Sequence, residues 1–210
     1  MSKRRKIDNF SMRIWLETIG NVVGTGGLNS VLNYAHLQKY IDNPPPDNDE
    51  LEIPVEDYTN FTRSLLEVFG SKGTRSLQLR AGREFVQIGV KKRPRVVKAL
   101  QLGSRLIPET KRIHLVLEKW IEESEKRFPS LLYKPRIELK EEETYFFLTD
   151  KDHPESDGIT SARPVCGIYA GILQAMIEWI TGHTHPVEEI ECRALGGMFD
   201  VFRISKQRSE

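Results

Sequence analysis

The chain has 210 residues, of which 39% are hydrophobic and 29% charged, a balance that suits one globular domain with a full hydrophobic core. Its 31 lysines and arginines are matched by 30 aspartates and glutamates, so no overall positive field would hold it to nucleic acid. Its apolar stretches are too short to span a membrane, and its basic start lacks the apolar run of a signal peptide. Two cysteines suit a reducing compartment, so we expect a cytoplasmic protein.

The first part of the sequence has helical periodicity. Apolar residues recur every three or four positions, and glycine or proline interrupts the pattern. A run of three prolines within residues 42–49 predicts an exposed loop. Pro108 opens the strongest amphipathic helix, because proline is tolerated in a first turn. Helices are predicted over residues 13–23, 28–37, 55–69 and 108–128, with two or three short ones over 74–106.

After Pro129 the pattern changes to short segments that are typical of strands. Two hairpins are predicted, over 132–139 with 144–148 and over 187–194 with 198–204, and a helix over 164–180 lies between them. This order predicts an α+β fold in which a helical N-terminal half packs with an antiparallel sheet. We expect residues 1–12 to form a tail and residues 13–206 a single ligand-binding domain, helical over 13–128 and sheet-containing over 129–206.

The last third of the chain resembles the 4-vinyl reductase domain family, whose members are described as predicted hydrocarbon-binding proteins. The family's pattern there is a cysteine that opens an amphipathic helix, an acidic strand, a second cysteine, alanine and glycine, a third cysteine and an aromatic residue. Asp200 stands where the family has its third cysteine. The residues that match are Cys166, Gly171, Glu189, Cys192, Ala194, Gly196 and Phe202.

The resemblance implies a fold shared with transport-particle (TRAPP) subunits and with sensor domains that respond to aromatic hydrocarbons. Such domains are α+β, usually homodimeric, and enclose a small-molecule pocket. Some bind zinc through their cysteine frame, and one branch is associated with bacteriochlorophyll synthesis. The chain has no nicotinamide or flavin motif, and a reductase needs a source of hydride, so we expect no independent catalysis.

A metal site is the first candidate that follows from this pattern of cysteines and acidic residues. It consists of Cys166, Glu189, Cys192 and Asp200, because thiolates and carboxylates together can satisfy a zinc ion. Residues three apart on a regular strand point to opposite faces, so Glu189 and Cys192 converge only at a bulge or strand end. The alternative is that both cysteines are small buried hydrophobic residues in a frame that has lost its metal. No cofactor is certain, and zinc is the candidate.

A ligand pocket is the second candidate. His114 lies at the edge of the apolar stripe of its helix, where its imidazole could face a cavity. The alternative for each of the aromatic residues is an ordinary place in the core. The candidate ligand-binding residues are His114, Tyr145, Phe147, Tyr169 and Trp179.

The sequence thus predicts a non-catalytic domain that binds a small hydrophobic or aromatic molecule and acts as a sensor, carrier or regulator. One alternative is an accessory protein of chlorophyll or other tetrapyrrole synthesis that presents a pigment precursor to a reductase. Another is a dimeric scaffold without a ligand. His183 and His185 could chelate a metal, but they lie in a polar turn without an obvious third ligand. The expected partners are a second copy of the chain and the small ligand, with no nucleic acid and no membrane span.

Overall fold

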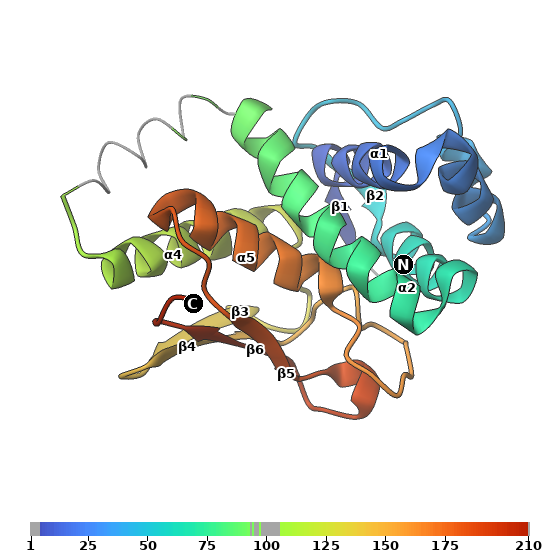
Figure 1. Ribbon diagram of the computed structural model, residues 1–210. Helices are drawn as coiled ribbons and strands as arrows, with labels where there is room; N and C mark the ends of the chain where they lie inside the picture. The colour runs from blue at the N-terminus through green and yellow to red at the C-terminus, as the bar shows by residue number, and fades with distance from the viewer. Residues whose placement is uncertain (1–4, 93, 95–96, 98–105, 210) are drawn as a thin grey trace.

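The protein is α+β, with helices stacked above one face of an antiparallel sheet (Figure 1). The computed structural model describes residues 5–92, 94, 97 and 106–209, without the side chains of residues 71 and 72. The helices are α1 (Asn9–Tyr34), η1 (Gln38–Tyr40), α2 (Val55–Lys92), α4 (Glu109–Arg127), α5 (Gly167–Thr181) and η2 (Arg193–Leu195). The strands are β1 (Lys6–Asp8), β2 (Leu51–Pro54), β3 (Ile137–Glu141), β4 (Tyr145–Asp150), β5 (Val187–Glu191) and β6 (Asp200–Ser205).

The larger sheet has the strand order β3-β4-β6-β5, and every neighbouring pair is antiparallel. Burial alternates along β4 and β6, as the two-residue period of a strand with one covered face requires. Leu148 pairs with Phe202 in the middle of the sheet, and both are fully buried. Helix α5 covers this buried face (Figure 1). The two predicted hairpins and the helix between them are confirmed.

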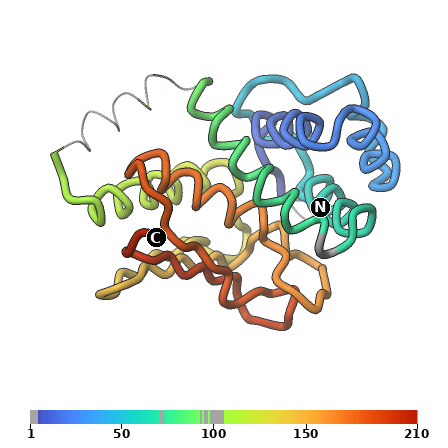
Figure 2. The backbone as a smooth tube through the Cα atoms, viewed as in Figure 1, coloured from blue at the N-terminus to red at the C-terminus, as the bar shows by residue number. Residues whose placement is uncertain are grey.

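Helices α2 and α5 touch at the level of their backbones, through one glycine from each. A methyl group at Gly82 would lie 2.6 Å from the backbone nitrogen of Ile172, and one at Gly171 would collide with the backbone of Leu79. Glycine is the residue that permits such an approach. The tube in Figure 2 shows the two helices running close together, with α5 between α2 and the sheet.

The helical half differs from the prediction in its segmentation. Residues 9–34 form one helix with a kink at Gly24 (φ 76°), and α2 likewise continues across Gly70 (φ 70°). Over residues 74–92, one continuous helix replaces the short helices that were expected, because packing outweighs the modest helix-breaking tendency of Gly82 and Gly89. Most of the remainder, 93–105, lies outside the described residues.

The segment predicted as an N-terminal tail contributes to the fold from residue 6 onward. Strand β1 pairs antiparallel with β2, and α1 begins at residue 9. The side chain of Asp8 caps α1 by accepting a hydrogen bond from the backbone nitrogen of Ser11 at 2.9 Å. Among the helices that the structure describes, none combines the length and the apolar character needed to cross a membrane.

Candidate ligand-binding site

An apolar cavity of about 180 Å³ opens between α2, α4 and α5, and we call it the outer groove. Helix α2 contributes a wall that includes Phe85 and Gly89, while α5 contributes Met176 and Trp179. The full lining is Phe10, Phe85, Val86, Gly89, Val90, Val97, Val116, Lys119, Trp120, Glu123, Arg127, Met176 and Trp179. Small-molecule sites typically combine such an apolar wall with a few polar groups.

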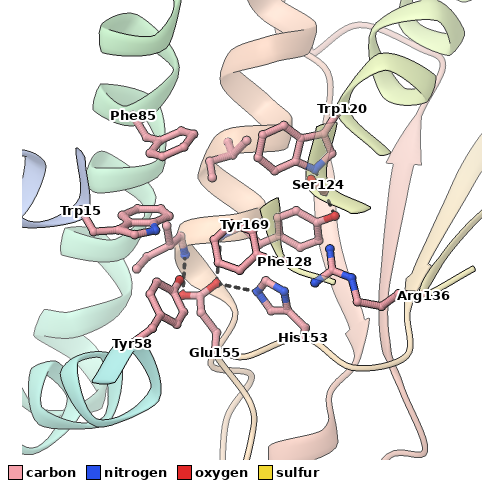
Figure 3. A pocket seen from close by; sticks show the side chains of 12 residues that line it. Trp15, Tyr58, Phe85, Trp120, Ser124, Phe128, Arg136, His153, Glu155 and Tyr169 are labelled. Carbon is pink, nitrogen blue, oxygen red and sulfur yellow. Dashed lines mark hydrogen bonds and ion pairs between the residues drawn. The ribbon is translucent and has the colours of Figure 1, made fainter. Parts of the chain in front are cut away.

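A smaller cavity of about 30 Å³, the inner chamber, lies deeper between the same helices and the start of β3 (Figure 3). It has room for one or two waters or for a group of that size. Its lining is Trp15, Tyr58, Phe85, Trp120, Ser124, Phe128, Arg136, His153, Glu155, Ile168, Tyr169 and Ile172. The chamber is therefore walled by aromatic rings and floored by charged groups.

Phe85 and Trp120 line both cavities and stand between them. The ring of Phe85 stacks on Trp15 at a centroid distance of 4.7 Å and meets Trp120 edge-to-face at 6.4 Å. The chain has three tryptophans, at positions 15, 120 and 179, and each lines at least one of the cavities. Tryptophan fluorescence therefore reports directly on this region.

The floor of the chamber is a buried network of four charged side chains. His153 lies 3.2 Å from a carboxylate oxygen of Asp150 and 3.2 Å from one of Glu155, and Arg136 lies 3.5 Å from Asp150. Burial alone would lower the pKa of His153, but the carboxylates of Asp150 and Glu155 beside its ring outweigh burial and raise that pKa to about 9. The network thus holds two cations and two anions and is close to neutral.

Glu155 also fixes the beginning of α5. Its carboxylate accepts hydrogen bonds from the backbone nitrogens of Ile168 (3.2 Å) and Tyr169 (3.0 Å). These N–H groups have no partner within the helix, and a negative charge is favourable at a helix N-terminus. The sequence analysis missed this role, because Glu155 lies twelve residues before the helix in a polar loop.

Three buried nitrogens of the chamber lining lack a hydrogen-bond partner. They are the indole nitrogen of Trp15, Nε of Arg136 and Nδ1 of His153, of which the last makes only its ion pair with Asp150. Trp15 and Arg136 are 3% and 2% exposed. In contrast, the indole nitrogen of Trp120 donates to the hydroxyl oxygen of Tyr169 at 3.0 Å. Buried polar groups are nearly always paired, so these unpaired nitrogens mark the chamber as a place where a polar atom could bind.

The structure brings two of the five predicted ligand-binding residues to these cavities. Trp179 lines the outer groove and Tyr169 the inner chamber. His114 contacts the sheet instead, with Nδ1 2.8 Å from Glu141. Tyr145 and Phe147 lie on the face of β4 opposite its buried residues, with their ring centroids 6.2 Å apart. A binding role for these five residues stays a prediction.

The four candidate metal ligands do converge, since their ligand atoms all lie within 4.8 Å of one another. A bulge between Glu189 and Glu191 brings Glu189 and Cys192 to one side. Both cysteines are buried and free. Asp200 accepts hydrogen bonds from the hydroxyl of Ser156 (2.6 Å) and the backbone nitrogen of Arg193 (2.9 Å). A metal-binding role for this set likewise stays a prediction.

Proton affinities in this cysteine cluster are strongly perturbed. A hydrogen bond from the Cys166 thiol lowers the pKa of Cys192 to about 6. Burial, together with the neighbouring Cys192, raises the pKa of Glu189 to about 8. The backbone nitrogen of Cys166 donates to both carboxylate oxygens of Glu189, at 3.3 and 3.2 Å. The cluster can therefore share one negative charge through hydrogen bonds.

Comparison with known proteins identifies the fold. No family model and no curated protein matches the sequence. Among solved structures, the Fe(II) unliganded H-NOX protein from K. algicida superposes with a TM-score of 0.60 and 11% identity, over 97% of this chain and 98% of that one. The Fe(II)NO form of an H-NOX protein from S. oneidensis gives a TM-score of 0.58 and 14% identity, over 93% and 99%. The chain has the H-NOX fold.

This finding corrects the resemblance drawn from the sequence. The chain is not identified as a 4-vinyl reductase or transport-particle protein, because no family model supports that resemblance and the two matched structures described above are H-NOX proteins. The residues that suggested it, from Cys166 to Phe202, form a short frame that did not determine the family. The association with pigment synthesis loses its basis with the resemblance. The homodimer, which also followed from the resemblance, stays a prediction.

The cofactor expectation is corrected as well. Another matched structure, with a TM-score of 0.60 and 11% identity over 97% of both chains, was solved to study how porphyrin distortion modulates heme redox potential. The expectation of no certain cofactor, with zinc as the candidate, does not fit such neighbours. Heme is therefore the cofactor whose fit to this chain has to be tested.

The lining of the outer groove does not fit heme held by histidine. Heme iron is held by histidine, cysteine, methionine or tyrosine, and Met176 is the one such residue among the described residues of this lining. His114 contacts Glu141 and Phe146 rather than the groove. His153 lines only the inner chamber, where carboxylates face both of its ring nitrogens.

Proposed function

We propose that this chain is a non-catalytic domain that binds a small apolar molecule in the outer groove and acts as a sensor, carrier or regulator. The observation that carries the proposal is an apolar cavity of about 180 Å³ between three helices. An engineered apolar cavity of roughly 150 Å³ binds benzene. The outer groove therefore has room for one aromatic ring with a short substituent.

The charged residues of the lining support a binding role rather than a catalytic one. Lys119 pairs with Glu122 at 2.6 Å, and Arg127 pairs with Asp8 at 2.8 Å. Glu123 pairs with Lys126 at 3.1 Å. Since each of these groups is engaged in an ion pair, the described part of the lining offers the ligand mainly apolar contact. Burial of apolar surface then supplies most of the binding free energy.

The first experiment is a titration of the purified protein with naphthalene, followed by tryptophan fluorescence. We expect saturable quenching or a spectral shift, because all three tryptophans line the two cavities. Native mass spectrometry of the same sample tests for a retained ligand and for the homodimer. A protein that shows neither a retained ligand nor a response to naphthalene would contradict the proposal and favour the scaffold.

A substitution that fills the groove sharpens this test. Gly89 lines the groove, and a Cβ atom there would meet nothing within 4 Å, so Gly89→Leu should occupy the cavity without a clash. We expect at least a tenfold loss of affinity with no loss of stability, because leucine also favours the helix. Gly73→Leu is the matched control on the same helix, where a Cβ meets only Phe69 at 3.8 Å. Equal binding by both variants would place the ligand elsewhere.

Heme is tested in parallel, because the matched structures include heme proteins. Hemin is added to the purified chain and the Soret absorption is recorded, first with the wild-type protein and then with Met176→Leu. A stoichiometric Soret shift that Gly89→Leu abolishes would replace the apolar molecule with heme as the ligand of the groove. With the present lining we expect only weak, non-saturating changes.

A further inference from the structure

The two cavities adjoin each other. The outer groove and the inner chamber share Phe85 and Trp120, which meet edge-to-face at 6.4 Å (Figure 3). Side-chain rotamers interconvert between a few staggered states, and a rotation of Phe85 would connect the chamber to the groove. A narrow group could then extend from a ligand in the groove into the chamber.

The chamber offers that group a hydrogen-bond donor. The indole nitrogen of Trp15 is buried and has no hydrogen-bond partner, and an unpaired buried N–H is unfavourable. The side chain of Trp15 lines the chamber, so an oxygen atom that comes to lie beside its N–H would accept this hydrogen bond. Arg136 Nε, another unpaired donor of the lining, favours an acceptor in the same way.

The charges of the chamber indicate that the group is neutral. Arg136 and His153 are the cations of the floor, and Asp150 and Glu155 are its carboxylates. An additional carboxylate or ammonium would enter a buried site without a counter-charge, which is costly. The volume of about 30 Å³ limits the group to one or two heavy atoms.

We infer that the ligand carries a small uncharged oxygen group, an alcohol or a carbonyl, on its apolar body, and that this oxygen accepts a hydrogen bond from Nε1 of Trp15. The inference rests on the proposed function, because the apolar body must occupy the outer groove. It adds a class of ligand: apolar alcohols, aldehydes and ketones rather than hydrocarbons or acids.

The test compares 4-phenylbutan-1-ol with butylbenzene, which differ by one hydroxyl group, in calorimetric titrations of the full chain. The ratio of the two dissociation constants is measured for the wild-type protein and for Trp15→Phe, which keeps a ring and removes the N–H donor. We expect the substitution to weaken the alcohol about tenfold relative to the hydrocarbon, the size of effect expected when one buried hydrogen bond is lost.

Trp179→Phe is the matched control, because Trp179 lines only the outer groove. It should weaken both compounds by the same factor. If Trp15→Phe leaves the ratio unchanged, the head-group inference is wrong while the proposed function stands. If the wild-type protein binds neither compound, the proposed function itself fails, and the inference falls with it.

A measurement on the wild-type protein keeps the test independent of how well the variant folds. The three tryptophans give three indole N–H signals in an NMR spectrum of protein labelled at tryptophan. The Trp15 signal should move downfield with the alcohol and much less with the hydrocarbon, because only the alcohol supplies an acceptor. The same shift with both compounds would overturn the inference.

Discussion

Replacement of Gly82 by alanine tests how closely α2 and α5 must pack. The new methyl group would lie 2.6 Å from the backbone nitrogen of Ile172 and closer still to the carbonyl oxygen of Ile168. The helices would have to separate by about 1 Å to restore van der Waals contact. Overpacking costs roughly 1–3 kcal/mol, and the better helix propensity of alanine returns about 1 kcal/mol. Because both obstructing atoms belong to the backbone, we expect a net loss of about 2 kcal/mol in the free energy of unfolding.

The assay is urea denaturation followed by far-UV circular dichroism, with Gly89→Ala as the matched control. Gly89 lies on the same helix, and a Cβ atom there meets nothing within 4 Å, so this control should gain about 1 kcal/mol from helix propensity alone. The two alanines should therefore shift the urea midpoint in opposite directions. If Gly82→Ala proves as stable as Gly89→Ala, the backbone contact between α2 and α5 does not limit the packing.

Three further predictions concern the chamber and the cysteine cluster. The pKa of His153 is raised from 6.5 to about 9, so its contribution to stability, on the order of 3 kcal/mol, should be complete below pH 6.5 and lost as the pH rises through 9. Urea titrations at several pH values measure the difference in the free energy of unfolding between the wild type and His153→Gln. A difference that does not change with pH would contradict the raised pKa. Phe85→Ala should join the two cavities and lower the free energy of unfolding by about 3 kcal/mol. The variant should then bind biphenyl in the fluorescence titration, whereas unchanged ligand selectivity would show that Phe85 does not separate the two cavities. Despite the lowered pKa of Cys192, both thiols are buried and should react with Ellman's reagent only at the rate of unfolding; rapid reaction of the native protein would show that the cluster is open to solvent.

The elements that the sequence predicted well are those whose pattern is local. The helix predicted over 108–128 is α4, Glu109–Arg127, because one apolar stripe and an initial proline define it within its own residues. The strand predicted over 144–148 is β4, where burial alternates residue by residue. The kinked helix α1 was divided in two, because Gly24 interrupts the pattern although the chain resumes the helix immediately afterwards.

The candidate site could not be predicted in this way, because it is assembled from distant parts of the chain. Trp15, Phe85, Trp120 and Tyr169 come from four different helices and meet through ring contacts. No spacing in the sequence records such a meeting, and for Tyr169, the one of these four that was a candidate, the pattern favoured an ordinary place in the core. The cysteine frame misled the assignment of family for the opposite reason: it is a conspicuous local motif, whereas the H-NOX fold is recognised at 11–14% identity only from the arrangement of the whole chain.

The glycine contact between α2 and α5 also explains why a cavity exists beside a tightly packed core. The backbones touch at Gly82 and Gly171, and further along the same two helices Gly89 and Trp179 face the outer groove instead. The contact at one end holds the helices together, and the absence of a side chain at Gly89 leaves space at the other. The fold thus determines where the cavity lies, while the side chains determine what it accepts. That division is consistent with one fold holding heme in some proteins, while the groove of this chain is lined by no described histidine and is the place where we propose an apolar ligand with a neutral oxygen.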